Sequence, residues 1–294
     1  MSDIQLQARH MPFEFKNIDA GAWSNGDRLK SHFVNGVIFI LPAGEDFFIK
    51  TMRRVKPMVK DEKLKKKLGK FCGQEAHHAK SHRVYNDYLV DQGYEKLLVH
   101  EKRLVTVLNW LVEKGKKSDF IAKFNIALTA AAEHFTSTIA HLVVSDPEQL
   151  LQSKEPVSSM LYWHAVEEIE HKDVCFDIFQ EVSGSYIMRI VAYFTIMLLF
   201  GGFWVRASGY LYYKDKMHKD GKLYNKLKTL IFTRYSDGRI GLLRKIFPEW
   251  LLFFKPNFHP NQIDDYPLIE QWVEDYKAGK DLMSVEIERY LPAR

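Results

Sequence analysis

Cysteine, surplus charge and phosphate-binding glycine motifs are scarce in this sequence, and each shortage excludes a class of protein. Two cysteines among 294 residues, Cys72 and Cys175, exclude a disulfide scaffold and a cysteine-based zinc finger, and they fit a reducing cytoplasm. The net charge is only +5, which gives no reason to expect nucleic-acid binding. The chain has no dinucleotide-binding glycine pattern and no Walker-type phosphate loop. The N-terminal residues show no secretory signal, so a cytoplasmic location is expected, with attachment to the inner face of the membrane as the alternative.

Apolar residues recur with helical spacing along most of the chain, and no segment shows the sustained alternation of a half-buried strand. The fold class predicted is therefore all-α, with short connections that make neighbouring helices antiparallel. Proline interrupts helix interiors, so a break is expected at Pro42. The expected helices cover 28–40, 43–57, 61–91, 94–114, 119–146 and 156–182.

Residues 190–205 are sixteen consecutive uncharged residues between Arg189 and Arg206. A bilayer-spanning helix needs about 20 apolar residues, whereas shorter runs are more often core or interfacial. Three interpretations stay open for this segment: a buried bundle helix, an anchor on a membrane surface, and a true span. The chain is accordingly divided into an irregular arm (1–27), a helix bundle (28–184), and an apolar helix with an aromatic-rich helical extension packed on the bundle (185–294).

Two Glu-x-x-His units lie on two of the long expected helices. Glu75 precedes His78 by three residues, and Glu168 precedes His171 by three. Residues i and i+3 share one face of a helix, so each carboxylate and imidazole can reach the same ion. One such unit is weak evidence, but two copies on two long helices favour a metal site.

Two further glutamates complete a recognisable order along the chain. Glu45 and Glu133 lie among apolar or small residues, and the gaps between successive carboxylates are 30, 58 and 35 residues. A gap of 30 or 35 residues lets the chain run down one helix, pass through a turn and come back along half of the next helix, so that the two carboxylates lie at the same height. The gap of 58 residues leaves room for one more helix. This order matches di-metal carboxylate bundles, in which two helices each supply one Glu and two supply Glu-x-x-His.

The six side chains resemble the ligand set of the ferritin-like di-iron or di-manganese superfamily. Within it, the chain resembles a bacterial family labelled "predicted metal-dependent hydrolase". The resemblance implies a ferritin-like bundle that binds two metal ions, iron being favoured and manganese or zinc remaining open. A ligand set of carboxylate oxygens and imidazole nitrogens, without a thiolate, suits iron or manganese better than copper(I). The matching stretches are residues 42–48, 133–136, 163–172 and 255–260.

Three more residues are candidates for supporting roles beside the ligands. Glu167 also shares a face with His171 and competes with Glu168 as a ligand; the three-residue spacing favours Glu168. Glu167 then becomes a partner for a ligand imidazole. His82 and His164 lie one turn from His78 and Glu168, and they are expected to line the site or transfer protons rather than bind metal.

Three functions remain open on this basis. Oxygen-dependent oxidation of an apolar small molecule is ranked first, because carboxylate and imidazole ligands suit redox-active iron. Hydrolysis of an ester or phosphoester by metal-activated water comes second. A non-enzymatic iron-binding or membrane-associated protein comes third. The expected partners are an apolar substrate, no nucleic acid, and a membrane surface at residues 190–205, with self-association left open.

Overall fold

The protein is all-α in the part of the chain that the structure describes, as predicted. The structure is a computed structural model, and it describes residues 6–146, 156–224, 227, 242–283 and 287–290. No strand occurs among these residues. The longer α-helices are α1 (Arg28–Val55), α2 (Glu62–Leu89), α3 (Leu97–Lys117), α4 (Asp119–Ser145), α5 (Pro156–His171), α6 (Val174–Val182), α7 (Tyr186–Lys214), α9 (Leu242–Leu252) and α10 (Glu270–Lys277).

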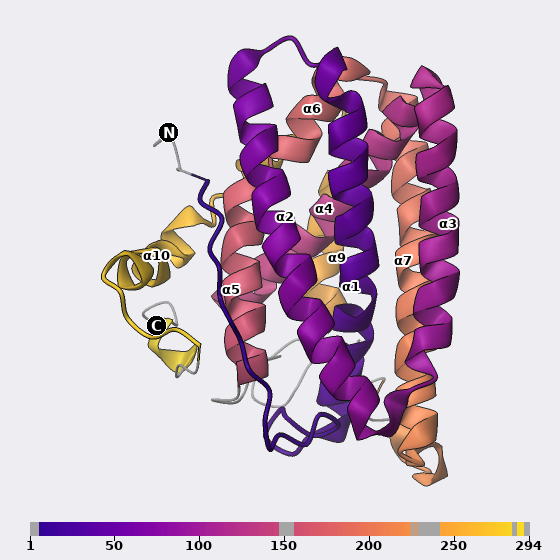
Figure 1. Cartoon of the computed structure of the whole chain (residues 1–294), viewed down its shortest axis with the longest axis vertical. Helices are drawn as coiled ribbons and strands as arrows, with labels where there is room; N and C mark the ends of the chain where they lie inside the picture. The colour runs from indigo at the N-terminus through magenta and orange to yellow at the C-terminus, as the bar shows by residue number, and fades with distance from the viewer. Residues whose placement is uncertain (1–5, 147–155, 225–226, 228–241, 284–286, 291–294) are drawn as a thin grey trace.

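The helices form an antiparallel bundle (Figure 1). Helix α1 packs against α2, α3, α4 and α7, while α4 packs against α3, α5, α6, α7 and α9. Helices α1, α2, α4 and α5 carry the predicted ligands. Helices α3 and α7 run side by side along one edge of the bundle, and α10 lies at the opposite edge.

The expected helix break at Pro42 is wrong, because α1 runs without interruption from Arg28 to Val55. An interior proline removes one backbone hydrogen bond and costs about 3 kcal/mol or more. Burial of α1 against four other helices offsets this cost. One turn before the proline, the Phe39 carbonyl also accepts a hydrogen bond from Asn86 Nδ2 at 3.3 Å. Tertiary packing therefore overrides the local signal.

The helix expected over 156–182 is also interrupted. Residues Lys172 and Asp173 separate α5 from α6, and both side chains are buried. Lys172 Nζ donates to the Ile263 carbonyl and to Asp265, while Asp173 accepts from Asn261 Nδ2. The C-terminal segment thus holds both side chains at the turn between the two helices, a contact that helical spacing does not reveal.

The ends of the helices follow ordinary capping chemistry. Asp27, Asp61 and Ser118 accept hydrogen bonds from the first backbone N–H groups of α1, α2 and α4. Gly93 has a φ of 98°, a conformation that favours glycine, where the chain turns from α2 toward α3. These caps and turns fix the register of the helices that carry the predicted ligands.

Among the described residues, two helices are long and apolar enough to cross a bilayer, but they differ in burial. The most apolar window of Arg28–Met58 is 78% buried inside the protein, whereas that of Tyr186–Lys214 is only 22% buried. The first is therefore a core helix. The second, α7, covers the bundle with one side and leaves the other side open.

Candidate metal centre

The six predicted ligands come from four helices and converge inside the bundle. Helix α1 supplies Glu45, α2 supplies Glu75 and His78, α4 supplies Glu133, and α5 supplies Glu168 and His171. None of these residues is more than 3% exposed. The fold thus brings together carboxylates and imidazoles that are up to 126 residues apart.

The donor atoms of the six predicted ligands form two overlapping groups. One contains Glu75, Glu133, Glu168 and His171, and the other contains Glu45, Glu75 and His78. Two further groups include the neighbouring histidines: Glu45 with His82 and His164, and His78 with His164 and Glu168. Within each group, one candidate atom from every residue lies within 4.8 Å of the others. Glu75 belongs to both of the groups formed by the predicted ligands, so it is the residue that connects them.

The distances around His171 suit donors that share one ion. His171 Nε2 lies 3.3 Å from Glu75 Oε1, 3.3 Å from Glu133 Oε2 and 3.5 Å from Glu168 Oε1. Two donors each about 2.1 Å from one ion are about 3.0–3.4 Å apart at octahedral to tetrahedral angles. His171 Nε2 has no hydrogen-bond partner, so these contacts are not ordinary hydrogen bonds.

Unpartnered buried atoms are concentrated at this centre. Burying a polar atom without a hydrogen bond is costly, and such atoms are uncommon in native structures. Five of the six predicted ligands carry them, seven atoms in total, and together they form a ready donor set for cations. The atoms are Glu45 Oε2, Glu75 Oε1 and Oε2, His78 Nδ1, Glu133 Oε1 and Oε2, and His171 Nε2.

The electrostatics also favour cations. Burial raises the pKa of Glu75 and raises that of Glu133 well above its ordinary value. Burial opposes ionisation of Glu168 too, but His171 and His164 outweigh it and lower the Glu168 pKa. Four ionised carboxylates in this space repel one another. Two divalent cations would neutralise them, so the residues present fit a di-metal centre.

Glu167 lies beside the centre and orients one imidazole. Its Oε2 accepts a hydrogen bond from His78 Nε2 at 3.0 Å, which leaves His78 Nδ1 free to face Glu75 at 3.7 Å. Burial opposes protonation of His78, but the hydrogen bond to Glu167 and the nearby charge of Glu75 raise its pKa to about 10. Gln74 Oε1 similarly accepts from His171 Nδ1 at 3.1 Å. Both imidazoles therefore turn their other nitrogen toward the carboxylates.

His82 and His164 connect two of the carboxylates through a chain of hydrogen bonds. His82 Nδ1 lies 2.8 Å from Glu45 Oε1, His82 Nε2 lies 3.0 Å from His164 Nδ1, and His164 Nε2 lies 2.8 Å from Glu168 Oε1. Burial lowers the pKa of both imidazoles. Two neutral imidazoles supply two N–H groups for three contacts, so one proton is missing. Without a bound cation, burial raises the pKa of Glu45 to about 7, and this carboxyl can then carry the third proton near neutral pH.

A buried arginine from the N-terminal segment was missed by the sequence analysis. Arg9 is 1% exposed, and its guanidinium contacts Glu167 at 3.1 Å and Glu170 at 2.6 Å. Gln74 Nε2 donates to the same Glu170 carboxylate. The segment runs alongside α2 and α5 (Figure 1). Arg9 thus holds the carboxylate that orients His78.

The sequence did contain a signal for this arginine. Met11, Phe13 and Phe15 are apolar at every second position, and Arg9 falls in phase with them; all four side chains are buried in the structure. Alternation is the pattern of an extended segment with one buried face. An arginine on such a face requires a buried anionic partner.

Thr136 is a second residue that was missed. Its hydroxyl donates to Glu168 Oε2 at 2.6 Å and leaves Glu168 Oε1 facing His164 and His171. Thr136 lies on α4 one turn after Glu133, so helical spacing places both on the face that points toward the centre. A lone threonine in a helix carries no distinctive signal, however.

Two apolar cavities meet at the edge of the centre, where Leu41, Thr136, His164 and Glu168 line both. One, the α3–α7 cavity, is bounded by side chains of α1, α3, α4, α5 and α7 and also includes Glu45. The other extends between α1 and α4 toward Trp204 and Ile246. The centre is therefore open to apolar space on the side of His164 and Glu168.

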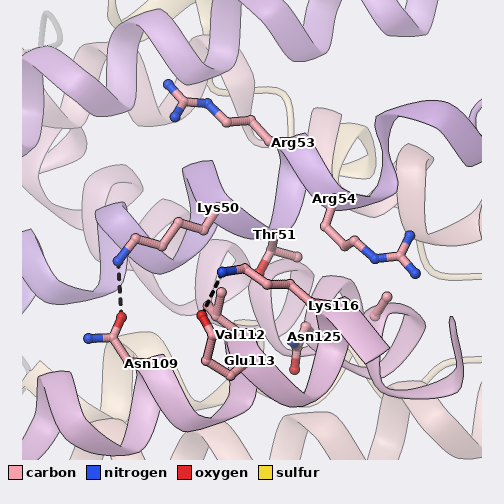
Figure 2. Close-up of a pocket in the computed structure, with 10 residues that line it drawn as sticks. Lys50, Thr51, Arg53, Arg54, Asn109, Val112, Glu113, Lys116 and Asn125 are labelled. Carbon is pink, nitrogen blue, oxygen red and sulfur yellow. Dashed lines mark hydrogen bonds and ion pairs between the residues drawn. The ribbon is translucent and has the colours of Figure 1, made fainter. Parts of the chain in front are cut away.

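Another pocket lies away from the centre, between α1, α3 and α4 (Figure 2). Four cations line it, and internal partners occupy three of them. Lys50 Nζ donates to Asn109, Lys116 Nζ donates to Glu113, and Arg54 donates to the Gly115 carbonyl and to Asp119. Figure 2 shows Arg53 directed away from the pocket. None of the predicted site residues lines this pocket, so it plays no part in the centre.

A comparison with protein families identifies the family of this chain. A family model described as predicted metal-dependent hydrolase matches residues 7–264, a range that includes Arg9 and every residue of the centre. Neither the curated proteins nor the solved structures gave a match.

Proposed function

Because the chain belongs to the predicted metal-dependent hydrolase family, we propose that it is a di-metal hydrolase acting on an ester or phosphoester of an apolar molecule. The observation that carries the proposal is the set of seven buried, unpartnered donor atoms around Glu75. The apolar cavities beside His164 and Glu168 supply the preference for an apolar substrate.

The proposed ligands are the six residues of the two overlapping groups. Glu45, Glu75 and His78 would hold one ion, and Glu75, Glu133, Glu168 and His171 would hold the other. Bound divalent ions would supply Lewis acidity and lower the pKa of a bound water toward neutral. Iron is the favoured metal, with manganese or zinc as alternatives, because the donors are carboxylates and imidazoles without a thiolate.

The protein's own residues would bind the substrate and handle protons. The α3–α7 cavity would hold the apolar part of the substrate and exclude water from it. The hydrogen-bonded imidazoles of His82 and His164 would hold the proton released when water adds to the substrate, and would return it to the leaving oxygen. His164 belongs to this pair and also lines the cavity, so proton transfer and substrate binding would meet at this residue.

Oxygen-dependent oxidation is a second candidate. One specific observation favours it: an all-carboxylate and imidazole set buried beside an apolar cavity suits redox-active iron. The family description gives this candidate no support, which reverses the order in which the sequence ranked the two reactions.

The test is a substrate panel on metal-free protein reloaded with iron, manganese or zinc. Hydrolysis predicts release of alcohol or phosphate from esters or phosphoesters at equal rates with and without oxygen. Oxidation instead predicts oxygen uptake coupled to substrate loss with iron alone. Protein that binds two ions and turns over neither class would overturn both and leave the iron-binding alternative.

His164→Gln separates proton transfer from metal binding. We expect kcat for ester hydrolysis to fall by about 10²-fold, because a positioned acid–base group contributes at least that much. Metal analysis should still find the wild-type number of ions. Glu113→Gln, at an exposed ion pair on α3, is the matched control and should change neither quantity. Loss of metal in His164→Gln would make His164 a ligand, and an unchanged kcat would remove it from the reaction.

A further inference from the structure

One side of α7 is an uncovered apolar surface. Ile187 and Leu198 are each 75% exposed, Val205 is 71% exposed, and Val191 and Phe194 are about half exposed. Their spacing of three, four or seven residues places them on one face of the helix. This stripe extends for about 27 Å at 1.5 Å per residue. No described segment covers it, and monomeric soluble proteins rarely expose apolar patches of this extent.

The helices next to α7 also expose apolar side chains, Val99 and Trp110 on α3 and Phe247 and Leu251 on α9. Helix α3 is joined to α7 where Arg206 Nε donates to His100, and α9 is joined to it where the Tyr193 hydroxyl donates to the Trp250 carbonyl. The apolar stripe on α7 and these four side chains are called the α7 face below.

Basic residues accompany the α7 face. The exposed charged side chains of α3 and α7 are seven basic and one acidic. Lys116 pairs with Glu113 and Lys214 with Glu95, which leaves an excess of five cations that an anionic surface complements. A second copy would bring the same excess of cations against its partner, which disfavours a symmetric dimer through this face. The basic residues are Lys102, Arg103, Lys114, Lys116, Lys117, Arg206 and Lys214, and the acidic one is Glu113.

The contacts of α7 with the bundle decide how it meets a membrane. Its inner side packs on α1 and α4. Trp204 Nε1 donates to the Phe33 carbonyl at 2.9 Å, and the Tyr212 hydroxyl donates to the Leu29 carbonyl at 3.1 Å. Crossing a bilayer would break these contacts and leave the Phe33 and Leu29 carbonyls without their partners. The helix therefore suits the interface, lying flat with its apolar stripe toward the acyl chains.

The α3–α7 cavity lies directly beneath this face. Leu104 and Leu108 of α3 and Leu199, Phe200 and Phe203 of α7 line it, and its inner end reaches Glu45, His164 and Glu168. The cavity thus connects the two helices of the exposed face with the candidate centre. A chain-like apolar molecule entering between α3 and α7 would meet only apolar side chains before it reached the carboxylates and the imidazole.

We propose that the α7 face docks on an anionic lipid bilayer and that the α3–α7 cavity admits an acyl chain from that bilayer to the centre. The docking surface stands on its own observations, whereas the lipid substrate rests on the proposed hydrolase function. The substrate class is accordingly a membrane lipid or another long-chain ester rather than a water-soluble one.

The test is flotation of the metal-loaded protein with vesicles of phosphatidylcholine alone or mixed with phosphatidylglycerol. We expect wild type to float with the anionic vesicles and to be released by salt. The double variant Val191→Glu, Leu198→Glu should reduce vesicle binding by at least about tenfold, because it places two charges in the stripe. Val84→Glu is the control, since Val84 is an exposed apolar residue on α2, away from the face.

A charge variant provides an independent arm. Arg103→Glu with Lys114→Glu should weaken binding to anionic vesicles and leave weak binding to neutral ones unchanged, with circular dichroism confirming the fold. Wild type that fails to float, or stripe variants that float normally, would overturn the proposal. A wild-type dimer that the stripe variant converts to monomer, without any vesicle binding, would assign the face to a second copy.

The activity readout keeps this proposal distinct from the proposed function. The stripe variant should hydrolyse a short soluble ester with wild-type kcat/KM and lose activity only on long-chain esters in vesicles. Wild type that floats but hydrolyses nothing would refute the hydrolase while leaving the docking surface intact. A stripe variant with equal activity on both substrates would refute delivery from the bilayer.

Discussion

Glu133→Gln is expected to remove one of the two metal ions and to lower hydrolytic activity by about 10³-fold or more, since a bound ion supplies several kcal/mol of transition-state stabilisation. Both oxygens of Glu133 are buried and lack hydrogen-bond partners, so no other group depends on them for a hydrogen bond. Glutamine keeps the shape of the side chain and loses the charge. The effect should therefore appear in metal content rather than in folding.

Thermal unfolding gives this variant a distinctive signature. In the metal-free protein, burial and the charge of Glu168 raise the pKa of Glu133 well above its ordinary value, which lowers the stability of the fold at neutral pH. Metal-free Glu133→Gln should therefore unfold at a temperature equal to or above that of metal-free wild type. Metal stabilises the folded state by about 4 kcal/mol at 1,000 times its dissociation constant. This metal-induced rise should be clearly smaller in the variant.

The control for this experiment is Glu113→Gln, an exposed glutamate that pairs with Lys116 on α3. It should keep two ions per chain, full activity and the full metal-induced rise in melting temperature. Two ions bound to Glu133→Gln with wild-type affinity would show that Glu133 is not a ligand. A metal-free variant that unfolds well below metal-free wild type would instead assign Glu133 a structural role.

The sequence could predict the helices and the convergence of the carboxylates because both follow from local spacing. Glu75 and His78 share a helical face whatever the helix packs against. The gap of 30 residues from Glu45 to Glu75 is the length of chain that brings the next helix back to the same height in the bundle. Burial of the six side chains follows from their apolar neighbours. The predicted break at Pro42 was wrong because it considered only the backbone hydrogen bond that the proline removes. It did not include the stabilisation that α1 gains by packing against four other helices.

The supporting groups could not be predicted in the same way because they depend on contacts between distant segments. Arg9 meets Glu167 across 158 positions of the chain, and no local pattern gives the depth at which the arm crosses α5. His82 and His164 were placed near the site, but their mutual contact depends on the rotation of α2 relative to α5. The interruption between α5 and α6 at Lys172 likewise depends on a distant contact, the ion pair of Lys172 with Asp265.

Arg9→Met is expected to lower the free energy of unfolding by about 3–5 kcal/mol, the usual cost of removing one partner from a buried ion pair. Arg9 donates to both Glu167 and Glu170, and its guanidinium also lies over the rings of Trp272 and Tyr276. Methionine preserves the length and apolar stem of the side chain. The loss therefore measures the two carboxylates left buried without their cation.

Urea unfolding of the metal-free protein measures this loss, and Arg83→Met is the matched control. Arg83 pairs with Asp46 at 2.6 Å on the surface, where both side chains are more than 40% exposed, so its removal should cost no more than about 1 kcal/mol. The double variant Arg9→Met, Glu170→Gln should recover part of the stability, because it removes one of the two stranded charges. Equal destabilisation by the two arginine variants would contradict a buried ionic role for Arg9.

Metal affinity separates a role at the centre from a purely structural one. Arg9 contacts Glu167, and Glu167 accepts from His78 Nε2 and thereby sets which nitrogen faces the ions. Losing a group that orients a ligand typically costs about 10- to 100-fold in metal affinity. We expect a loss of this size in Arg9→Met, measured at temperatures where the variant is fully folded. Unchanged affinity would confine Arg9 to holding the N-terminal segment on the bundle, because the orientation of His78 would then not depend on the arginine.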